Sequence, residues 1–155
     1  ISLAKQIPNS RIVATDYQNG ILNLARQNAE NNKVNIHFLL HDLLHDDFPL
    51  SNQKFDVIVS NPPYIPQSYK ANLHKNVADY EPATALFVPD EDPLLFYRKI
   101  AELASLILVP GGSLFFETHD DFHPQLSQLL ANHDFHQIEL LKDTNNKPRF
   151  IICKK

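Results

Sequence analysis

The sequence predicts an α/β fold with a mostly parallel, doubly wound sheet. Short β-branched runs alternate along the chain with segments of helical periodicity, and this alternation with short connections favours parallel strands. A turn-rich segment separates the last two predicted strands, which indicates an antiparallel hairpin at the C-terminal end. With 155 residues, the chain is long enough to form one domain with a sizeable core.

The first half of the chain predicts two helices and three strands. Residues 1–7 form a helical pattern that no capping residue precedes, and Gln18–Asn31 has its apolar residues on one face. Strands are expected at Arg11–Thr15, Val34–Leu40 and Phe55–Ser60. The last of these contains an uninterrupted Val-Ile-Val run, which predicts that both of its faces are buried.

The second half predicts a long loop, two helices and three strands. Residues 65–91 are polar and contain proline, as is typical of a lid or a binding loop. A helix is expected at Pro93–Val109, and the Pro-Gly-Gly that follows is expected to end it. The remaining elements are a strand at Ser113–Glu117, a helix at Phe122–His133, and the hairpin strands His136–Leu141 and Arg149–Cys153.

Composition and charge argue against several classes of function. The net charge is −4 and no block of Lys and Arg occurs, so we expect no direct contact with nucleic acid. The single cysteine, Cys153, cannot form an internal disulfide, which favours a reducing cytoplasm. No apolar stretch approaches the length of a membrane span and no signal peptide is present, so we expect no membrane association.

The strand expected at Phe55–Ser60 runs into the sequence Asn61-Pro62-Pro63-Tyr64. The prolines have fixed φ angles and lack backbone N–H groups, so the turn is stiff. The Asn61 side chain and the Pro62 carbonyl offer acceptors for an incoming NH₂ group, and Tyr64 can cover its flat face. This turn of residues 61–64, called the Asn61 corner below, suits a reaction at a planar amine or amide nitrogen. A Pro-Pro sequence after a strand is, however, often only a loop.

Two carboxylates follow the neighbouring predicted strands, at the edge of the sheet where α/β proteins bind ligands. Asp16 can accept hydrogen bonds from ribose hydroxyls, or it can cap the helix that follows. Asp42 can accept from an exocyclic adenine amine while Leu43 lines the face of the ring, or it can simply end a strand. Together with Asn61 they predict a graded site for ribose, base and reacting nitrogen.

Histidine pairs at helical spacing raise the question of a metal site. His41 and His45 are four residues apart, as are His119 and His123. Neither pair has a convincing third ligand, so we expect no metal.

Taken together, these features resemble the class I S-adenosylmethionine-dependent methyltransferases, which have a Rossmann-like sheet. It is most similar to the HemK/PrmC family, which methylates the glutamine amide in the Gly-Gly-Gln motif of peptide chain release factors. The resemblance extends over nearly the whole chain, and the Tyr-Glu-Pro-x-x-Ala-Leu segment narrows it to protein-glutamine methylation. The matching segments are Ala14–Asp16, Asn28–Ala29, His41–Leu44, Phe55–Pro66, Tyr80–Leu86, Phe96–Arg98, Pro110–Gly112 and Pro148–Phe150.

The resemblance implies roles for individual residues. S-adenosylmethionine is the expected cofactor, and a release factor is the expected partner and substrate. Asn61 and Pro62 are expected to hold the amide NH₂, aided by Pro63, while Tyr64 packs on the amide plane. Glu81 and Pro82 are expected to shape the substrate entrance.

The sequence departs from the family at its start. The Gly-rich first motif and the helical N-terminal domain of the family are absent, and the sequence contains no Gly-x-Gly. We therefore interpret residues 1–155 as a partial methyltransferase catalytic domain without its first strand, so that Arg11–Thr15 and Phe55–Ser60 lose a shared neighbour. We expect a longer natural protein, and we expect the isolated chain to bind the cofactor poorly and to be inactive.

Two other functions remain open at the level of sequence. The same corner occurs in enzymes that methylate amino groups of nucleic-acid bases, although such an enzyme calls for a basic face. A non-catalytic domain of the same fold is the other alternative.

Overall fold

The computed structural model describes residues 1–72 and 82–155. The chain folds as two compact units, Ile1–Pro49 and Leu50–Lys155. Within the described residues no helix is long and apolar enough to cross a membrane.

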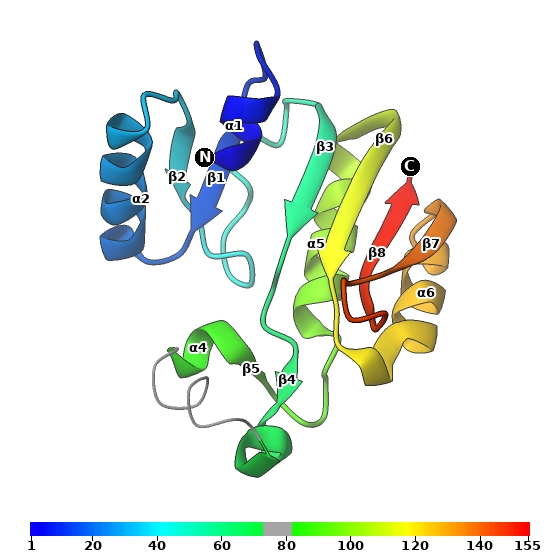
Figure 1. Ribbon diagram of the computed structural model, residues 1–155. Coiled ribbons are helices and arrows are strands. Elements are labelled where there is room, and N and C mark those ends of the chain that lie inside the picture. Colours follow the sequence, from blue (N-terminus) through cyan, green and yellow to red (C-terminus); the bar gives the residue numbers. More distant parts are fainter. Residues whose placement is uncertain (73–81) are drawn as a thin grey trace. The chain divides into compact units, whose positions relative to one another are not determined.

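The first unit is a two-stranded parallel sheet with one long helix. Its elements are α1 (Ser2–Gln6), β1 (Val13–Asp16), α2 (Asn19–Asn31) and β2 (His37–Leu40). Helix α2 runs alongside both strands and buries Leu22 and Ala29 (Figure 1). The second strand is shorter than predicted because it begins at His37 instead of Val34, and Leu40 at its end is 57% exposed.

The second unit contains a four-stranded sheet in the order β3-β6-β8-β7. The first pair is parallel, and β8 is antiparallel to both of its neighbours (Figure 1). The predicted C-terminal hairpin is thereby confirmed. The strands are β3 (Phe55–Ser60), β6 (Leu108–Glu117), β7 (His136–Lys142) and β8 (Pro148–Lys154).

Two helices, α5 (Leu95–Ile107) and α6 (His123–Asn132), cover one face of this sheet. Side chains of alternate residues on the strands point to this face because successive residues of a strand face opposite ways. The core is mainly apolar, and burial of this surface is the main driving force for folding. It comprises Tyr97, Ile100, Ala101, Ala104, Leu114, Phe116, Leu126, Leu130, Ile151 and Cys153.

Short elements occupy the described part of the predicted binding loop of residues 65–91. Strand β4 (Ile65–Pro66) pairs in parallel with β5 (Phe87–Val88). The 3₁₀ helix η1 (Gln67–Asn72) follows β4, and the short helix α4 (Ala83–Leu86) precedes β5. The β4–β5 pairing therefore holds the two described ends of this segment to each other.

Strands β1 and β3 lie in separate sheets, as predicted for a fold without its first strand. Among the described residues, β1 pairs only with β2, and β3 pairs only with β6. The prediction that both faces of β3 are buried is wrong: Val57 is 51% and Val59 59% exposed. Helices α5 and α6 cover the opposite face of this sheet, and no described element of the second unit covers these two valines.

Strand β6 begins five residues earlier than predicted, at Leu108, so it includes the Pro-Gly-Gly sequence. Gly111 has a φ of 78°, a conformation that glycine adopts at little cost. A side chain on Gly112 would lie 2.9 Å from the Val109 carbonyl oxygen and 3.1 Å from that of Asp56. These two glycines allow the shift in register between β3 and β6 near their start.

The thiol of Cys153 is buried in strand β8, and this burial raises its pKa to about 12. Because the thiolate is the reactive form, we expect Cys153 to resist alkylation by iodoacetamide at neutral pH in the folded protein. In strong denaturant the same thiol should react at the rate of a free cysteine. Fast alkylation without denaturant, measured by mass spectrometry, would contradict the buried position.

Candidate active site

The Asn61 corner lies at the carboxyl end of β3. Ser60, the last residue of the strand, is paired with Phe116 of β6, so Asn61 comes level with the end of that neighbouring strand. Pro62 is buried and Pro63 half-buried, whereas Asn61 is exposed. The prolines thus anchor the turn, and the Asn61 amide remains open to a ligand.

Tyr64 is fixed at three places in the second unit. Its backbone N–H donates to the Leu86 carbonyl at 3.2 Å, which ties the corner to α4. Its hydroxyl donates to Glu117 Oε1 at 3.2 Å, and its ring meets the ring of His119 edge-on, with 5.9 Å between centroids. Burial, and then the Glu117 carboxylate, raise the pKa of Tyr64, so its hydroxyl stays protonated and remains a donor.

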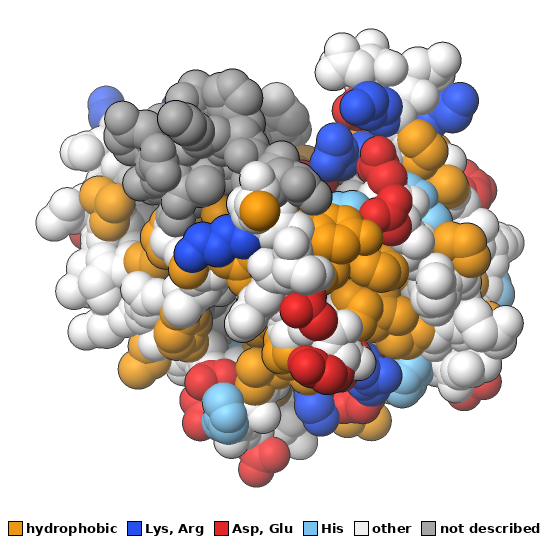
Figure 2. All heavy atoms as spheres, turned by 90° about the horizontal axis from the view of Figure 1, so that it is seen from below, with side chains coloured by type: hydrophobic (Ala, Val, Ile, Leu, Met, Phe, Trp, Pro, Cys, Tyr) orange, Lys and Arg blue, Asp and Glu red, His pale blue; other side chains and the backbone are white. Residues whose placement is uncertain are grey.

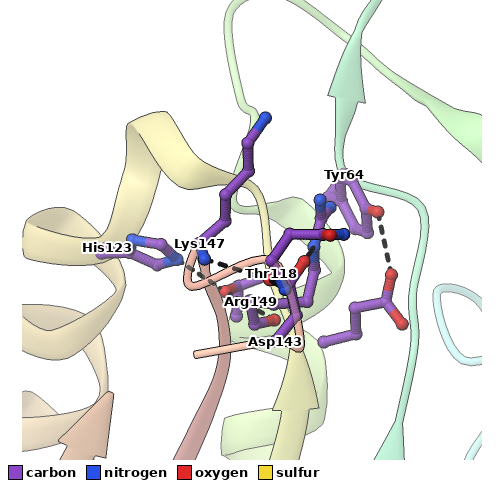
Figure 3. A network of polar contacts seen from close by, with 8 residues as sticks. Tyr64, Thr118, His123, Asp143, Lys147 and Arg149 are labelled. Carbon is purple, nitrogen blue, oxygen red and sulfur yellow. Dashed lines mark hydrogen bonds and ion pairs between the residues drawn. The ribbon is translucent and has the colours of Figure 1, made fainter. Parts of the chain in front are cut away.

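A polar network continues behind this tyrosine (Figure 3). The Thr118 backbone N–H donates to the Arg149 carbonyl at 2.8 Å, and the Thr118 hydroxyl donates to the same carbonyl at 3.2 Å. Thr118 Oγ1 and His123 Nε2 are also hydrogen-bonded to each other, at 2.7 Å. Burial lowers the pKa of His123, which keeps the ring neutral.

The histidines that sequence spacing raised as metal ligands have other partners. His123 bonds Thr118, and the His119 ring lies 5.6 Å from that of Tyr69 and 5.4 Å from that of Phe122. His45 donates from Nδ1 to Asp42 at 2.9 Å. Across residues 1–72 and 82–155, no group of three or more His, Cys, Asp or Glu side chains is placed to hold a metal ion.

A cavity of about 340 Å³ opens beside Asn61 on the sheet face that α5 and α6 leave uncovered. Its lining is almost entirely apolar, and Asn61 and Glu117 bring the main polar groups to it. The lining residues are Val59, Ser60, Asn61, Phe115, Phe116, Glu117, Leu141, Phe150 and Ile152. The corner and Glu117 therefore face a common, mostly apolar space.

Sequence reasoning missed Glu117 as a site residue. A signal was present, because Glu117 ends a predicted strand just as Asn61 follows one. Register makes these two strand ends neighbours, since Ser60 pairs with Phe116. The Glu117 carboxylate lies near Tyr64 because β6 is next to β3 in the sheet, and this strand order cannot be read from the sequence.

Asp16 is the last residue of β1 in the first unit, as predicted. Its Oδ1 accepts a hydrogen bond from the Gln18 backbone N–H at 2.7 Å. This hydrogen bond closes a local turn just before α2, whose N-cap is Gln18, so Asp16 is not the helix cap that the sequence offered as an alternative. For Oδ2 no hydrogen bond is found among the described residues, and Asp16 is half-buried, so this oxygen is available to a ligand hydroxyl.

Asp42 lies in the turn that follows β2. Its Oδ1 accepts from the Leu44 backbone N–H at 2.9 Å, and its Oδ2 accepts from His45. These hydrogen bonds, the one from His45 first, lower the pKa of Asp42, so the carboxylate is ionised. Leu43, the predicted neighbour of the adenine ring, is half-buried.

The predicted site residues fall into two groups. Asp16, Asp42 and Leu43 belong to the first unit, and Asn61 to Tyr64 belong to the second. The graded site that combines them stays a prediction. Glu81 lies outside the described residues, and Pro82 is exposed and immediately precedes α4.

Comparison with known proteins supplies the family. Residues 1–80 match the family model described as a methyltransferase domain, which is half of the chain. The chain belongs to this methyltransferase family.

Two relatives in this methyltransferase family are named release factor glutamine methyltransferase. The protein from Flavobacterium psychrophilum is 44% identical over 97% of the chain, and the one from Bacteroides thetaiotaomicron is 37% identical over 100% of it. These matches cover 52% and 55% of the two relatives, so the chain spans about half of their length. The resemblance to HemK/PrmC is thereby confirmed.

Solved structures show the same fold. A methyltransferase from Pyrococcus furiosus superimposes with a TM-score of 0.70 at 19% identity, covering 99% of this chain and 67% of that one. At such low identity the likeness concerns the fold alone, and it confirms the predicted class I methyltransferase sheet.

Proposed function

We propose that this chain forms part of the catalytic domain of an S-adenosylmethionine-dependent methyltransferase whose acceptor is a glutamine side-chain amide in a peptide chain release factor. The observation that carries the proposal is the 44% identity, over 97% of the chain, to a protein named release factor glutamine methyltransferase. The stiff corner at Asn61, open beside a mostly apolar cavity, supports it independently. The cytoplasm is the proposed location, because translation takes place there.

The proposed acceptor chemistry follows from the corner. An amide nitrogen is a weak nucleophile because its lone pair is delocalised, so positioning matters more than proton removal. The Asn61 side-chain oxygen and the Pro62 carbonyl accept hydrogen bonds from the NH₂ group and aim its lone pair. Tyr64, Pro63 and the apolar cavity wall exclude water from the amide. Glu81 and Pro82 remain the proposed residues of the substrate entrance.

The residues of the first unit suit the proposed cofactor. S-adenosylmethionine, when bound, supplies an electrophilic sulfonium methyl group. Asp16 Oδ2 can accept from ribose hydroxyls, and each Asp42 oxygen, which already accepts one hydrogen bond, has a second lone pair for the adenine amine. Leu43 offers an apolar contact to the ring.

Asp16→Ala should weaken binding of S-adenosylhomocysteine by about 10- to 100-fold, because hydrogen bonds to a charged acceptor are lost. Isothermal titration with the complete gene product that contains this sequence measures the change. The matched control is Asp47→Ala, since Asp47 is exposed in the same unit and makes no side-chain hydrogen bond to a described residue. Equal affinities of the two variants would remove Asp16 from the cofactor site.

Transfer of a labelled methyl group tests the function. The complete gene product is incubated with labelled S-adenosylmethionine and, in separate reactions, a release factor, a ribosomal protein and duplex DNA. We expect label on the release factor. Label confined to DNA would instead support methylation of a base.

Charge does not favour the nucleic-acid alternative. On the face shown in Figure 2, Lys and Arg side chains of the described residues lie among acidic and uncharged side chains and form no broad basic area. The whole chain has a net charge of −4. Non-specific affinity for nucleic acid depends on such a basic area.

A further inference from the structure

Glu117 ends strand β6 at the same level as the Asn61 corner. The parallel pairing of Ser60 with Phe116 places the residues that follow, Asn61 and Glu117, at neighbouring strand ends. Both line the same mostly apolar cavity. Glu117 is half-buried, and a carboxylate in such a setting is usually held by hydrogen bonds.

The side chain of Glu117 contacts the residue that is proposed to cover the acceptor. Its Oε1 accepts the hydroxyl proton of Tyr64 at 3.2 Å. Arg149 lies beside Tyr64 in Figure 3 and interacts with it electrostatically. The Tyr64 hydroxyl therefore lies between two charged side chains, Glu117 and Arg149, which hold it in place.

The backbone of Glu117 is itself anchored from the core. Tyr97, which is fully buried on α5, donates its hydroxyl to the Glu117 carbonyl at 2.9 Å, and its ring meets that of Phe116 edge-on at 5.1 Å. Burial raises the pKa of Tyr97, so this donor stays protonated. A continuous chain of contacts thus runs from the core through Glu117 to Tyr64.

We propose that Glu117 is a positioning residue, which holds Tyr64 in place over the amide bound at Asn61. This role rests on the proposed function of the corner and adds a residue to it. Without the carboxylate, rotation about χ1 and χ2 frees the Tyr64 ring, and the amide loses its fixed plane. Correct orientation of a weak nucleophile is a large part of the rate, so a loosened ring slows transfer.

Kinetics of three variants test the role. Glu117→Ala should lower kcat for release-factor methylation about tenfold, as should Tyr64→Phe, which removes the donor of the same hydrogen bond. The double variant should be no slower than either single one, because both remove one shared interaction. Glu117→Gln keeps an oxygen acceptor and should restore kcat to within about threefold of wild type. Glu139→Ala, an exposed glutamate on β7, is the control.

A purely structural role gives a different pattern. Each single variant would then lower the rate by reducing the amount of folded protein, and the two losses would multiply in the double variant. The thermal unfolding midpoint would fall in parallel with the rate. Effects of Glu117→Ala and Tyr64→Phe that multiply, or a Glu117→Ala variant with wild-type kcat, would overturn the proposal.

Ionisation of Tyr64 gives a readout that does not need activity. The groups that face this phenol are Glu117, Arg149, the hydroxyl of Tyr97 and the ring of His119. Removing the Glu117 charge in Glu117→Gln should lower the pKa of Tyr64, seen as earlier appearance of tyrosinate absorbance on raising the pH. The shift should be absent when Tyr64→Phe is also present.

The two readouts separate the inference from the proposed function. A wild-type protein that methylates no release factor contradicts the function alone. In that case the titration of Tyr64 decides the inference. A Tyr64 pKa that is the same in Glu117→Gln as in the wild type would overturn it.

Discussion

Asn61→Ala is expected to slow methyl transfer by the complete gene product by about 100-fold or more, the effect of removing one preorganised catalytic hydrogen-bonding group. The Asn61 side chain is exposed at the end of β3, on a turn that two prolines hold stiff. Its loss removes the acceptor that aims the NH₂ group, and nothing else in the corner has a side-chain amide. Initial rates at saturating release factor and S-adenosylmethionine measure the change.

Asn52→Ala is the matched control for this variant. Asn52 is exposed in the same unit, and its side chain makes no hydrogen bond to a described residue. We expect its rate and unfolding midpoint to equal those of the wild type. Wild-type turnover by Asn61→Ala would remove Asn61 from the mechanism.

Leu114→Ala should lower the free energy of unfolding by about 2–5 kcal/mol, the usual cost of a cavity in a well-packed core. Leu114 is fully buried in the centre of β6, and its neighbours in register are Ile58 of β3 and Cys153 of β8. Urea unfolding of the complete gene product, followed by circular dichroism, measures the loss.

Leu106→Ala deletes the same atoms at an exposed position. Leu106 is on α5 and is 66% exposed. We expect its effect to stay within about 0.5 kcal/mol, as for most surface substitutions. Equal losses at the two leucines would show that the core does not lie where β6 meets α5 and α6.

Most of the fold could be predicted because local patterns and tertiary structure agree. The Val-Ile-Val run of β3 and the turn-rich sequence before β8 each identified a strand correctly. Errors arose where burial depends on distant elements. The exposed faces of Val57 and Val59 depend on which elements cover the sheet, and a hydrophobic run in one strand holds no such information.

The start of β6 was misjudged for a local reason. Pro-Gly-Gly usually ends regular structure, but here Gly111 and Gly112 make a bulge inside a strand. The chain therefore passes from α5 into β6 without a loop.

The site was predicted in part. The motif at Asn61, Asp16 at the end of β1 and Asp42 after β2 could be found because polar residues at the ends of apolar strands stand out in the sequence. Glu117 could not, because its role depends on strand order and on the position of the Tyr64 hydroxyl. Contacts between residues 53 positions apart in sequence have no local signature.

The position of the transferred methyl group tests the central claim most directly. The complete gene product is incubated with S-adenosylmethionine and a release factor, and the peptides of the release factor are sequenced by tandem mass spectrometry. We predict one added methyl on the side-chain nitrogen of the glutamine in the Gly-Gly-Gln motif. A methyl group on any other residue, or none on the release factor while DNA is methylated, would contradict this account.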